Sequence, residues 1–188
     1  MNIGGLPGAT NILNVTSGVL YPYCKSAQVY RCPGDQDIVQ GSTGERVRDY
    51  SINGMLGNNL KGMTAHYNIQ EHLTFASVIN PNPSSATFFV EEQSSVDPSS
   101  TCINDWYFWV SPVLTADQQW GDDGPGSRHG NFGVFSYADG HVARMKWLDP
   151  YTQYMPYKIA PYSALENPDV RQIWLTTYAS GSVPGMPG

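Results

Sequence analysis

Charged side chains are scarce in this sequence. Asp, Glu, Lys and Arg make up 14% of the 188 residues, and the formal net charge is −6. A nucleic-acid partner is excluded, because contacts to phosphates require clustered Lys and Arg side chains. The basic residues are also scattered along the chain, so the sequence lacks the polybasic patch that binds anionic membrane surfaces.

Long apolar runs are absent as well. No segment approaches the roughly 18 consecutive apolar residues of a membrane-spanning helix, and residues 1–8 have neither the basic start nor the apolar stretch of a signal peptide. Hydrophobic residues nevertheless make up 40% of the sequence, which excludes a disordered chain. The length is typical of one folded domain, and we assign residues 1–188 to it.

Turn-forming and aromatic residues are abundant instead. The sequence contains 19 Gly and 14 Pro, and 12% of its residues are aromatic. This composition is typical of short strands joined by long loops, as in secreted and cell-surface domains. We therefore expect an extracytoplasmic protein, in the periplasm, at the cell surface or in an extracellular fibre. A targeting segment is then expected ahead of Met1 in the native protein.

Only three cysteines are present, Cys24, Cys32 and Cys102. An odd number allows at most one disulfide, with one thiol left over. Cys24 and Cys32 lie eight residues apart across an expected turn, which favours their pairing, while three buried free thiols remain the alternative. A zinc site is not expected, because the cysteines lack the close spacing of zinc ligands and no His pair accompanies them.

The strand signals are short and separated by turn residues. Runs of β-branched and aromatic residues predict strands at 49–53, 86–90 and 106–110. Two further runs, 132–137 and 142–148, flank Asp139-Gly140, a pair that tolerates the positive φ angles of a tight turn. We therefore predict a β-hairpin over residues 132–148. Its second arm has one apolar face, because apolar residues occupy alternate positions.

One helix is predicted near the C-terminus, over residues 168–180. Asn167 is its N-cap, followed by Pro168 at the first helical position, and four apolar residues line one face, namely Val170, Ile173, Trp174 and Tyr178. Residues 1–18 are expected to be an irregular lead-in, and residues 182–188 a tail. The predicted fold class is α+β, with an antiparallel sheet, long loops and a short C-terminal helix.

The residues around the hairpin invite a chemical interpretation. His129 precedes the first arm, Asp139 lies at the turn and His141 follows it, and such a set can bind a metal or transfer protons. An extended arm, however, separates His129 from Asp139 by roughly 30 Å, so one hairpin cannot bring them together. Glu91 and Glu92 are adjacent and would point to opposite faces of a strand. Known catalytic motifs are absent, so no catalytic residue is assigned and no enzyme is expected.

The same hairpin carries a family resemblance. His129, followed after nine residues by Asp139-Gly140, resembles the C-terminal signature of the H-x9-DG pseudopilin-like proteins. Further segments of that family are matched in the same order by residues 30–35 (YRCPGD), 51–54 (SING) and 80–90. The resemblance implies a pilin-like head, in which an antiparallel sheet packs against a long hydrophobic N-terminal helix that this chain does not contain.

The family resemblance implies a function through contacts. It implies a subunit of a type II secretion-like or type IV pilus-like fibre that binds other pilin-like subunits or secreted cargo. Such a subunit would reach the membrane only through the N-terminal helix. No cofactor is required, although pilin-like secretion proteins can bind calcium, and four acidic residues would then supply oxygen ligands, Asp35 with Asp37 or Asp122 with Asp123. These residues do not match the EF-hand pattern, and solvated loops are the alternative.

Aromatic side chains provide a second kind of contact surface. They offer a large contact area at low entropic cost, and the candidates for recognition are Trp106, Tyr107, Trp109 and Trp120. Their partner would be a protein or, if the chain is instead a carbohydrate-binding module, a sugar ring. The apolar residues of 106–110 and 142–148 are otherwise expected to fill the core.

Overall fold

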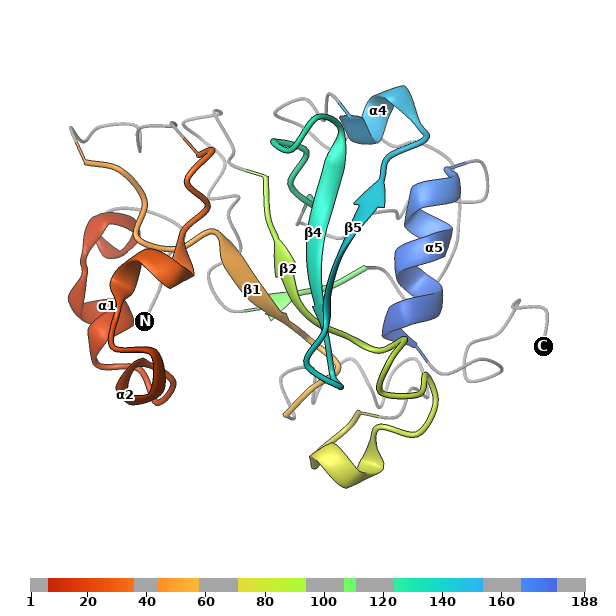
Figure 1. Ribbon diagram of the computed structural model, residues 1–188, viewed down its shortest axis with the longest axis horizontal. Coiled ribbons are helices and arrows are strands. Elements are labelled where there is room, and N and C mark those ends of the chain that lie inside the picture. Colours follow the sequence, from red (N-terminus) through yellow and green to blue (C-terminus); the bar gives the residue numbers. More distant parts are fainter. Residues whose placement is uncertain are drawn as a thin grey trace.

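The sheet is the centre of the fold. The computed structural model describes residues 7–35, 44–57, 71–93, 107–110, 124–153 and 167–178, and every structural statement concerns these residues. Within them, five strands form one sheet in the order β3-β1-β2-β4-β5 (Figure 1). The strands are β1 (Tyr50–Asn53), β2 (Thr87–Glu91), β3 (Tyr107–Phe108), β4 (Phe132–Tyr137) and β5 (Val142–Lys146). The predicted α+β class is confirmed.

The sheet is mixed rather than wholly antiparallel, which corrects the prediction. β1–β2, β2–β4 and β4–β5 pair antiparallel, whereas β1 and β3 pair parallel. β3 follows β2 in the sequence but pairs with β1, on the other edge of β1 from β2. Because β2 runs antiparallel to β1 and β3 reverses direction again, β3 runs parallel to β1.

The predicted hairpin is confirmed by β4 and β5. Their register runs from the Phe132–Lys146 pair to the Ser136–Val142 pair. Gly140 has a φ of +93° at the turn, a conformation that costs an L-residue free energy and glycine almost none. The backbone N–H of His141 donates to Asp139 Oδ1 at 3.1 Å, so Asp139 stabilises the turn in which it lies.

The C-terminal helix α5 (Pro168–Thr177) covers one face of the sheet (Figure 1). The Asn167 side chain accepts from the backbone N–H groups of Asp169 and Val170, as predicted for an N-cap. The core joins apolar residues of the helix and the sheet, chiefly Val90, Phe108, Phe135, Met145, Trp147, Val170, Ile173 and Trp174. The apolar faces of the third strand and of the hairpin arm thus fill the core. The helix ends at Thr177, three residues before the predicted end.

The N-terminal segment is helical where an irregular lead-in was predicted. Residues 7–35 contain single-turn helices, namely two 3₁₀ helices (Gly8–Thr10 and Ala27–Tyr30), α1 (Leu13–Thr16) and α2 (Tyr21–Cys24). The Asn11 side chain accepts from the Leu13 backbone N–H at 3.1 Å, and such local bonds organise turns too short to produce a helical hydrophobic period. Two more short elements are a 3₁₀ helix at Phe75–Ser77 and α4 at Pro150–Gln153.

α1 and α2 lie beside β1, on the side of the sheet away from α5 (Figure 1). Backbone hydrogen bonds attach the N-terminal segment to the residues just before β1, since Val47 N–H donates to Ala9 O at 3.0 Å and Asp49 N–H donates to Tyr30 O at 2.9 Å. Among the helices described, none has the length and apolar character needed to cross a bilayer. The predicted tail at 182–188 lies outside the described residues.

Candidate functional site

A buried polar cluster lies where the N-terminal segment meets the sheet. Its six members, hereafter the polar cluster, come from four separate segments and are Cys32, Asp35, Asp49, Glu91, Arg128 and His129. All of them have side chains that are buried or mostly buried. Cys32 and His129 are 97 positions apart in the sequence and yet in contact, so tertiary folding alone assembles the cluster.

The Cys32-Pro33-Gly34-Asp35 turn holds the Cys32 thiol in place. The Asp35 N–H donates to Cys32 O at 3.0 Å, and the Gly34 N–H donates to Cys32 Sγ at 3.3 Å. The Cys32 N–H donates to Asp49 Oδ2 at 2.7 Å. A Cβ atom added to Gly34 would lie 3.4 Å from Sγ and 3.7 Å from the Arg128 side chain. The turn is therefore packed closely around a fixed sulfur atom.

Glu91 is the last residue of β2, and its side chain is fully buried. Oε1 accepts from Arg128 Nη1 at 3.2 Å. A Cβ atom on Gly126 would lie 2.9 Å from Glu91 Cδ and Cγ, so only glycine fits beside the carboxylate. Oε2 is buried and makes no hydrogen bond with any described residue. One oxygen of this carboxylate is thus paired with Arg128, and the other faces His129 Nε2 at 3.2 Å.

One ring nitrogen of His129 faces both Cys32 and Glu91. Its Nε2 lies 3.3 Å from Cys32 Sγ and 3.2 Å from Glu91 Oε2. The three donor atoms all lie within 4.8 Å of one another. The His129 side chain is 34% exposed, whereas Cys32 and Glu91 have no exposed surface. The imidazole therefore forms the opening of the cluster to solvent.

Carboxylates dominate the electrostatics of the polar cluster. Arg128 Nε lies 3.5 Å from Asp35 Oδ1, which pairs the arginine with a second buried carboxylate. Burial, followed by the nearby Asp35 carboxyl, raises the pKa of Asp49 to about 7. Burial and then Glu91 raise the pKa of the Cys32 thiol to about 11. A cation would relieve this excess of buried acidic groups.

This arrangement does not match a nucleophilic catalytic site. A reactive cysteine needs solvent access and a lowered pKa, but the Cys32 thiol is buried and its pKa is raised. In a nucleophile–base–acid relay, the two nitrogens of the imidazole face different partners. Here a single nitrogen faces both the thiol and the carboxylate. The donor atoms converge on one point, as ligands do.

The disulfide predicted between Cys24 and Cys32 is not formed, and both are free thiols in the described part of the chain. Cys24 is exposed at the end of α2, and its Sγ lies 3.5 Å from Tyr30 Oη. A hydrogen bond from Tyr30 lowers the pKa of Cys24. The 3₁₀ helix Ala27–Tyr30 separates the two cysteines and directs them to different partners. Cys102 lies outside the described residues.

The two ends of the H-x9-DG-like signature lie at opposite ends of β4. His129 precedes the strand and belongs to the polar cluster, whereas Asp139 lies at the hairpin turn. His141 Nδ1 is 2.6 Å from Asp139 Oδ1, and its ring stacks on Tyr137 with centroids 4.3 Å apart. Hydrogen bonds from His141, first from its backbone, lower the pKa of Asp139. As expected, the hairpin does not bring His129 and Asp139 together.

The other predicted site residues are only partly described. Asp35 is buried beside Arg128 rather than placed in a solvated loop, while Asp37, Asp122 and Asp123 lie outside the described residues. Tyr107 and Trp109 are partly buried and pack against the core, and Trp106 and Trp120 are outside the described ranges.

The polar cluster could not be recognised from the sequence. Cys32 and His129 belong to separate sequence motifs, but no sequence spacing pairs them, and Glu91 is notable in the sequence only as one of two adjacent carboxylates, with Glu92. The sequence carries one indirect signal: Glu91 directly follows a predicted strand, and a buried carboxylate requires a partner in the folded protein.

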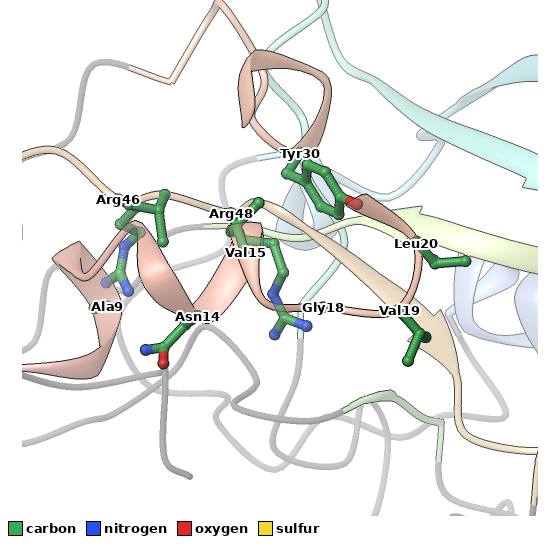
Figure 2. Close-up of a pocket in the computed structure, with 10 residues that line it drawn as sticks. Ala9, Asn14, Val15, Gly18, Val19, Leu20, Tyr30, Arg46 and Arg48 are labelled. Atoms are coloured by element: carbon green, nitrogen blue, oxygen red, sulfur yellow. The ribbon is translucent and has the colours of Figure 1, made fainter. Parts of the chain in front are cut away.

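Six large hydrophobic residues are exposed on the N-terminal segment. They form what we call the N-terminal apolar surface and are Ile12, Leu13, Val19, Leu20, Tyr23 and Val29. Val19 and Tyr23 are 84% and 88% exposed. A cavity of about 210 Å³ lies beside this surface, lined in part by Val19, Leu20 and Tyr30. Arg46 and Arg48, in the segment before β1, extend toward α1 and complete the wall of the cavity (Figure 2).

No protein-family model matches the chain, and no curated protein or solved structure matches it either.

Proposed function

We propose that the chain is the head domain of an extracytoplasmic, non-catalytic subunit of a type II secretion-like or type IV pilus-like fibre. The N-terminal apolar surface is the observation that carries the proposal. Its six exposed side chains lie within residues 12–29, in the short helices beside β1 and in the turns between them. Exposed apolar residues gathered on one segment are typical of a surface that binds another protein.

The motif residues support the same proposal through their structural roles. Cys32 and His129 tie the N-terminal segment to the sheet, and Asp139 and Gly140 form the hairpin turn. Such roles are structural and need no substrate. The buried Cys32 thiol, with its raised pKa, also agrees with a non-catalytic head.

The partner most consistent with this surface is another pilin-like subunit. In the resembling family a long hydrophobic helix enters the head from the N-terminal side, and fibre assembly packs such helices together. Residues 12–29, which carry the N-terminal apolar surface, lie beside β1 (Figure 1). This surface would pack against the helix of the same or a neighbouring subunit, which removes its side chains from water.

Localisation and assembly can be tested with the native gene. An epitope tag after residue 188 allows cell fractionation, mechanical shearing of surface fibres and chemical cross-linking in intact cells. We expect the tagged protein in the extracytoplasmic and sheared fractions, cross-linked to pilin-like subunits. A protein found only in the cytoplasm would contradict the proposal.

Surface variants test the mode of contact. Val19→Asp and Tyr23→Asp together place two charges on the N-terminal apolar surface, and Val142→Asp is the matched control because Val142 is 65% exposed on the hairpin. Burial of one large apolar side chain contributes about 1.5–3 kcal/mol, so the double variant should lower the cross-linked or sheared fraction at least about tenfold. Equal assembly of the double variant and the control would contradict a role for this surface.

The described residues do not favour the carbohydrate-binding alternative. Sugar binding requires two or three exposed rings in one plane. Of the candidate recognition residues that are described, Tyr107 and Trp109 are partly buried and pack against the core, and five further large aromatic side chains are fully buried, namely Trp147, Trp174, Tyr178, Phe108 and Phe135.

A further inference from the structure

We infer that Cys32, Glu91 and His129 form a binding site for a divalent transition-metal ion, with Zn²⁺ as the ion that suits the ligands best. This inference does not depend on the proposed fibre function. It departs from the expectation that no zinc site is present, which rested on the spacing of the cysteines and the lack of a His pair in the sequence. The ligands instead come from three segments that meet only in the folded chain.

Two of the distances between the donor atoms are close to those of a tetrahedral site, and all three donor atoms lie within 4.8 Å of one another. With metal–sulfur bonds of about 2.3 Å and metal–nitrogen and metal–oxygen bonds of about 2.05 Å, tetrahedral angles place sulfur and nitrogen about 3.6 Å apart, and nitrogen and oxygen about 3.3 Å apart. The observed separations are 3.3 Å from Cys32 Sγ to His129 Nε2 and 3.2 Å from His129 Nε2 to Glu91 Oε2. One ion can therefore contact all three atoms after small side-chain adjustments.

Glu91 supplies an independent indication of a ligand. Its Oε1 atom accepts from Arg128, whereas its buried Oε2 atom has His129 Nε2 as a polar neighbour at 3.2 Å, a contact that is an ion pair only when the imidazole is protonated. A buried carboxylate oxygen costs free energy unless a cation or a donor compensates it. Oε2 faces the same place as the thiol and the imidazole nitrogen. A metal ion at that place would supply a permanent cation for this oxygen.

The ligand types select a zinc-like ion over calcium or magnesium. Thiolate and imidazole are soft or borderline ligands, which favour Zn²⁺, whereas Ca²⁺ and Mg²⁺ prefer sites made only of oxygen. On binding, the Cys32 thiol loses its proton to solvent as the sulfur–metal bond forms. The Gly34 N–H already donates to Cys32 Sγ at 3.3 Å, and such an outer hydrogen bond orients a thiolate ligand.

The site also has an entry path and an open position. His129 is the only one of the three ligands with exposed surface, so an ion would reach the site past the imidazole. Three protein ligands leave the fourth tetrahedral position for water or for a group from a partner. The ion would bridge the N-terminal segment to β2 and to the segment before β4, and would therefore stabilise the folded state.

Cobalt spectroscopy on the full chain tests the inference directly. Cys24→Ser and Cys102→Ser provide a background in which Cys32 is the only thiol, and Co²⁺ is the probe because thiolate ligation produces a charge-transfer band in the near ultraviolet. We expect this band together with tetrahedral visible bands, saturating at one Co²⁺ per chain and abolished by one equivalent of Zn²⁺. A folded background protein that shows no charge-transfer band at equimolar Co²⁺ overturns the inference.

Ligand variants assign the site. Removal of an outer-shell partner already weakens metal binding by about 10–100-fold, so Cys32→Ser and His129→Gln should each weaken Zn²⁺ binding by at least about 100-fold in competition with a chromophoric chelator. Glu91→Gln should also weaken it. Cys24→Ser and His141→Gln are matched controls, since each removes an exposed group of the same type, and they should leave the affinity unchanged.

Thermal unfolding distinguishes loss of the site from loss of the fold. Zn²⁺ should raise the unfolding midpoint of the wild type and of both controls, and leave that of folded Cys32→Ser unchanged. If the ligand variants do not fold, the cobalt titration of the background protein decides the matter alone. Equal Zn²⁺ affinity in the wild type and in folded Cys32→Ser refutes the assignment.

Discussion

The two sides of the sheet are held together by different forces. On the α5 side, Trp147, Ile173 and Trp174 are fully buried in one continuous apolar core. On the α1 side, most large apolar residues of the segment 7–35 are exposed, and its attachment to the sheet relies on polar contacts such as those of Cys32 and Asp35 with Asp49, Arg128 and His129.

The region that stabilises the fold is therefore different from the region that exposes apolar side chains. Burial of apolar surface is the main favourable term in folding, so the sheet and α5 account for most of the free energy of unfolding. The N-terminal segment leaves most of its large apolar side chains exposed, and the polar cluster positions it on the sheet. The cluster therefore joins the stable part of the fold to the part that we propose binds a partner.

The largest expected effect is on the apolar side. Trp174→Ala removes a fully buried indole from the core, and a large-to-small change of this kind costs about 4 kcal/mol. Urea unfolding should show this loss, while Leu175→Ala, at a residue that is 47% exposed, should change the free energy of unfolding by less than about 1 kcal/mol. Similar losses in the two variants would show that α5 is not the main cover of the sheet.

Removal of Arg128 tests the polar side. Arg128→Ala leaves Glu91 and Asp35 without this cation, and breaking a buried ion pair costs about 3 kcal/mol. Hydrogen exchange should accelerate in residues 27–35 more than in α5, because the loss falls on the attachment of the N-terminal segment. Arg144→Ala is the control, since this exposed side chain lies over the Phe132 ring. Uniform acceleration across the molecule would argue against two separately held regions.

A smaller effect is expected at the hairpin turn. Gly140→Ala places a Cβ atom at a φ of +93°, where an L-residue is strained by about 1 kcal/mol. The substitution meets no neighbouring atom within 4 Å, so the cost should come from the backbone alone. Urea unfolding should detect this loss without any change in Zn²⁺ affinity, because the turn lies at the far end of β4 from His129.

The smallest effect concerns the two described thiols. Because the pKa of Cys24 is lowered, its thiolate fraction rises at a lower pH than that of an ordinary cysteine, and alkylation should reach its plateau at correspondingly lower pH. Tyr30→Phe removes the hydrogen bond that is the largest cause of the lowered Cys24 pKa, and it should move the pH dependence of Cys24 alkylation to higher pH. Cys32, buried and with its pKa raised to about 11, should react only when the protein unfolds. Mass spectrometry of alkylated peptides measures both rates.

The parts of the fold that could be predicted are those with local causes. The Asp139-Gly140 pair specifies the hairpin because it tolerates the positive φ angle of the turn. Asn167-Pro168 specifies the start of α5, because the Asn167 side chain accepts from the first free backbone N–H groups and Pro168 suits the first helical position. The alternating apolar residues around Met145 and Trp147 also predicted the buried face correctly. Each of these signals lies within a few residues of the element that it forms.

The sequence by itself therefore determined the α+β class, the hairpin and the capped helix, because local backbone preferences and apolar periodicity need no distant partner. Only the tertiary structure decided that β3 runs parallel to β1, that Cys32 faces His129 rather than Cys24, and that Glu91 completes this group. These outcomes depend on contacts between residues far apart in the chain, such as the 97 positions from Cys32 to His129. Local backbone preferences cannot specify such a contact, because the two residues come together only when the whole sheet forms.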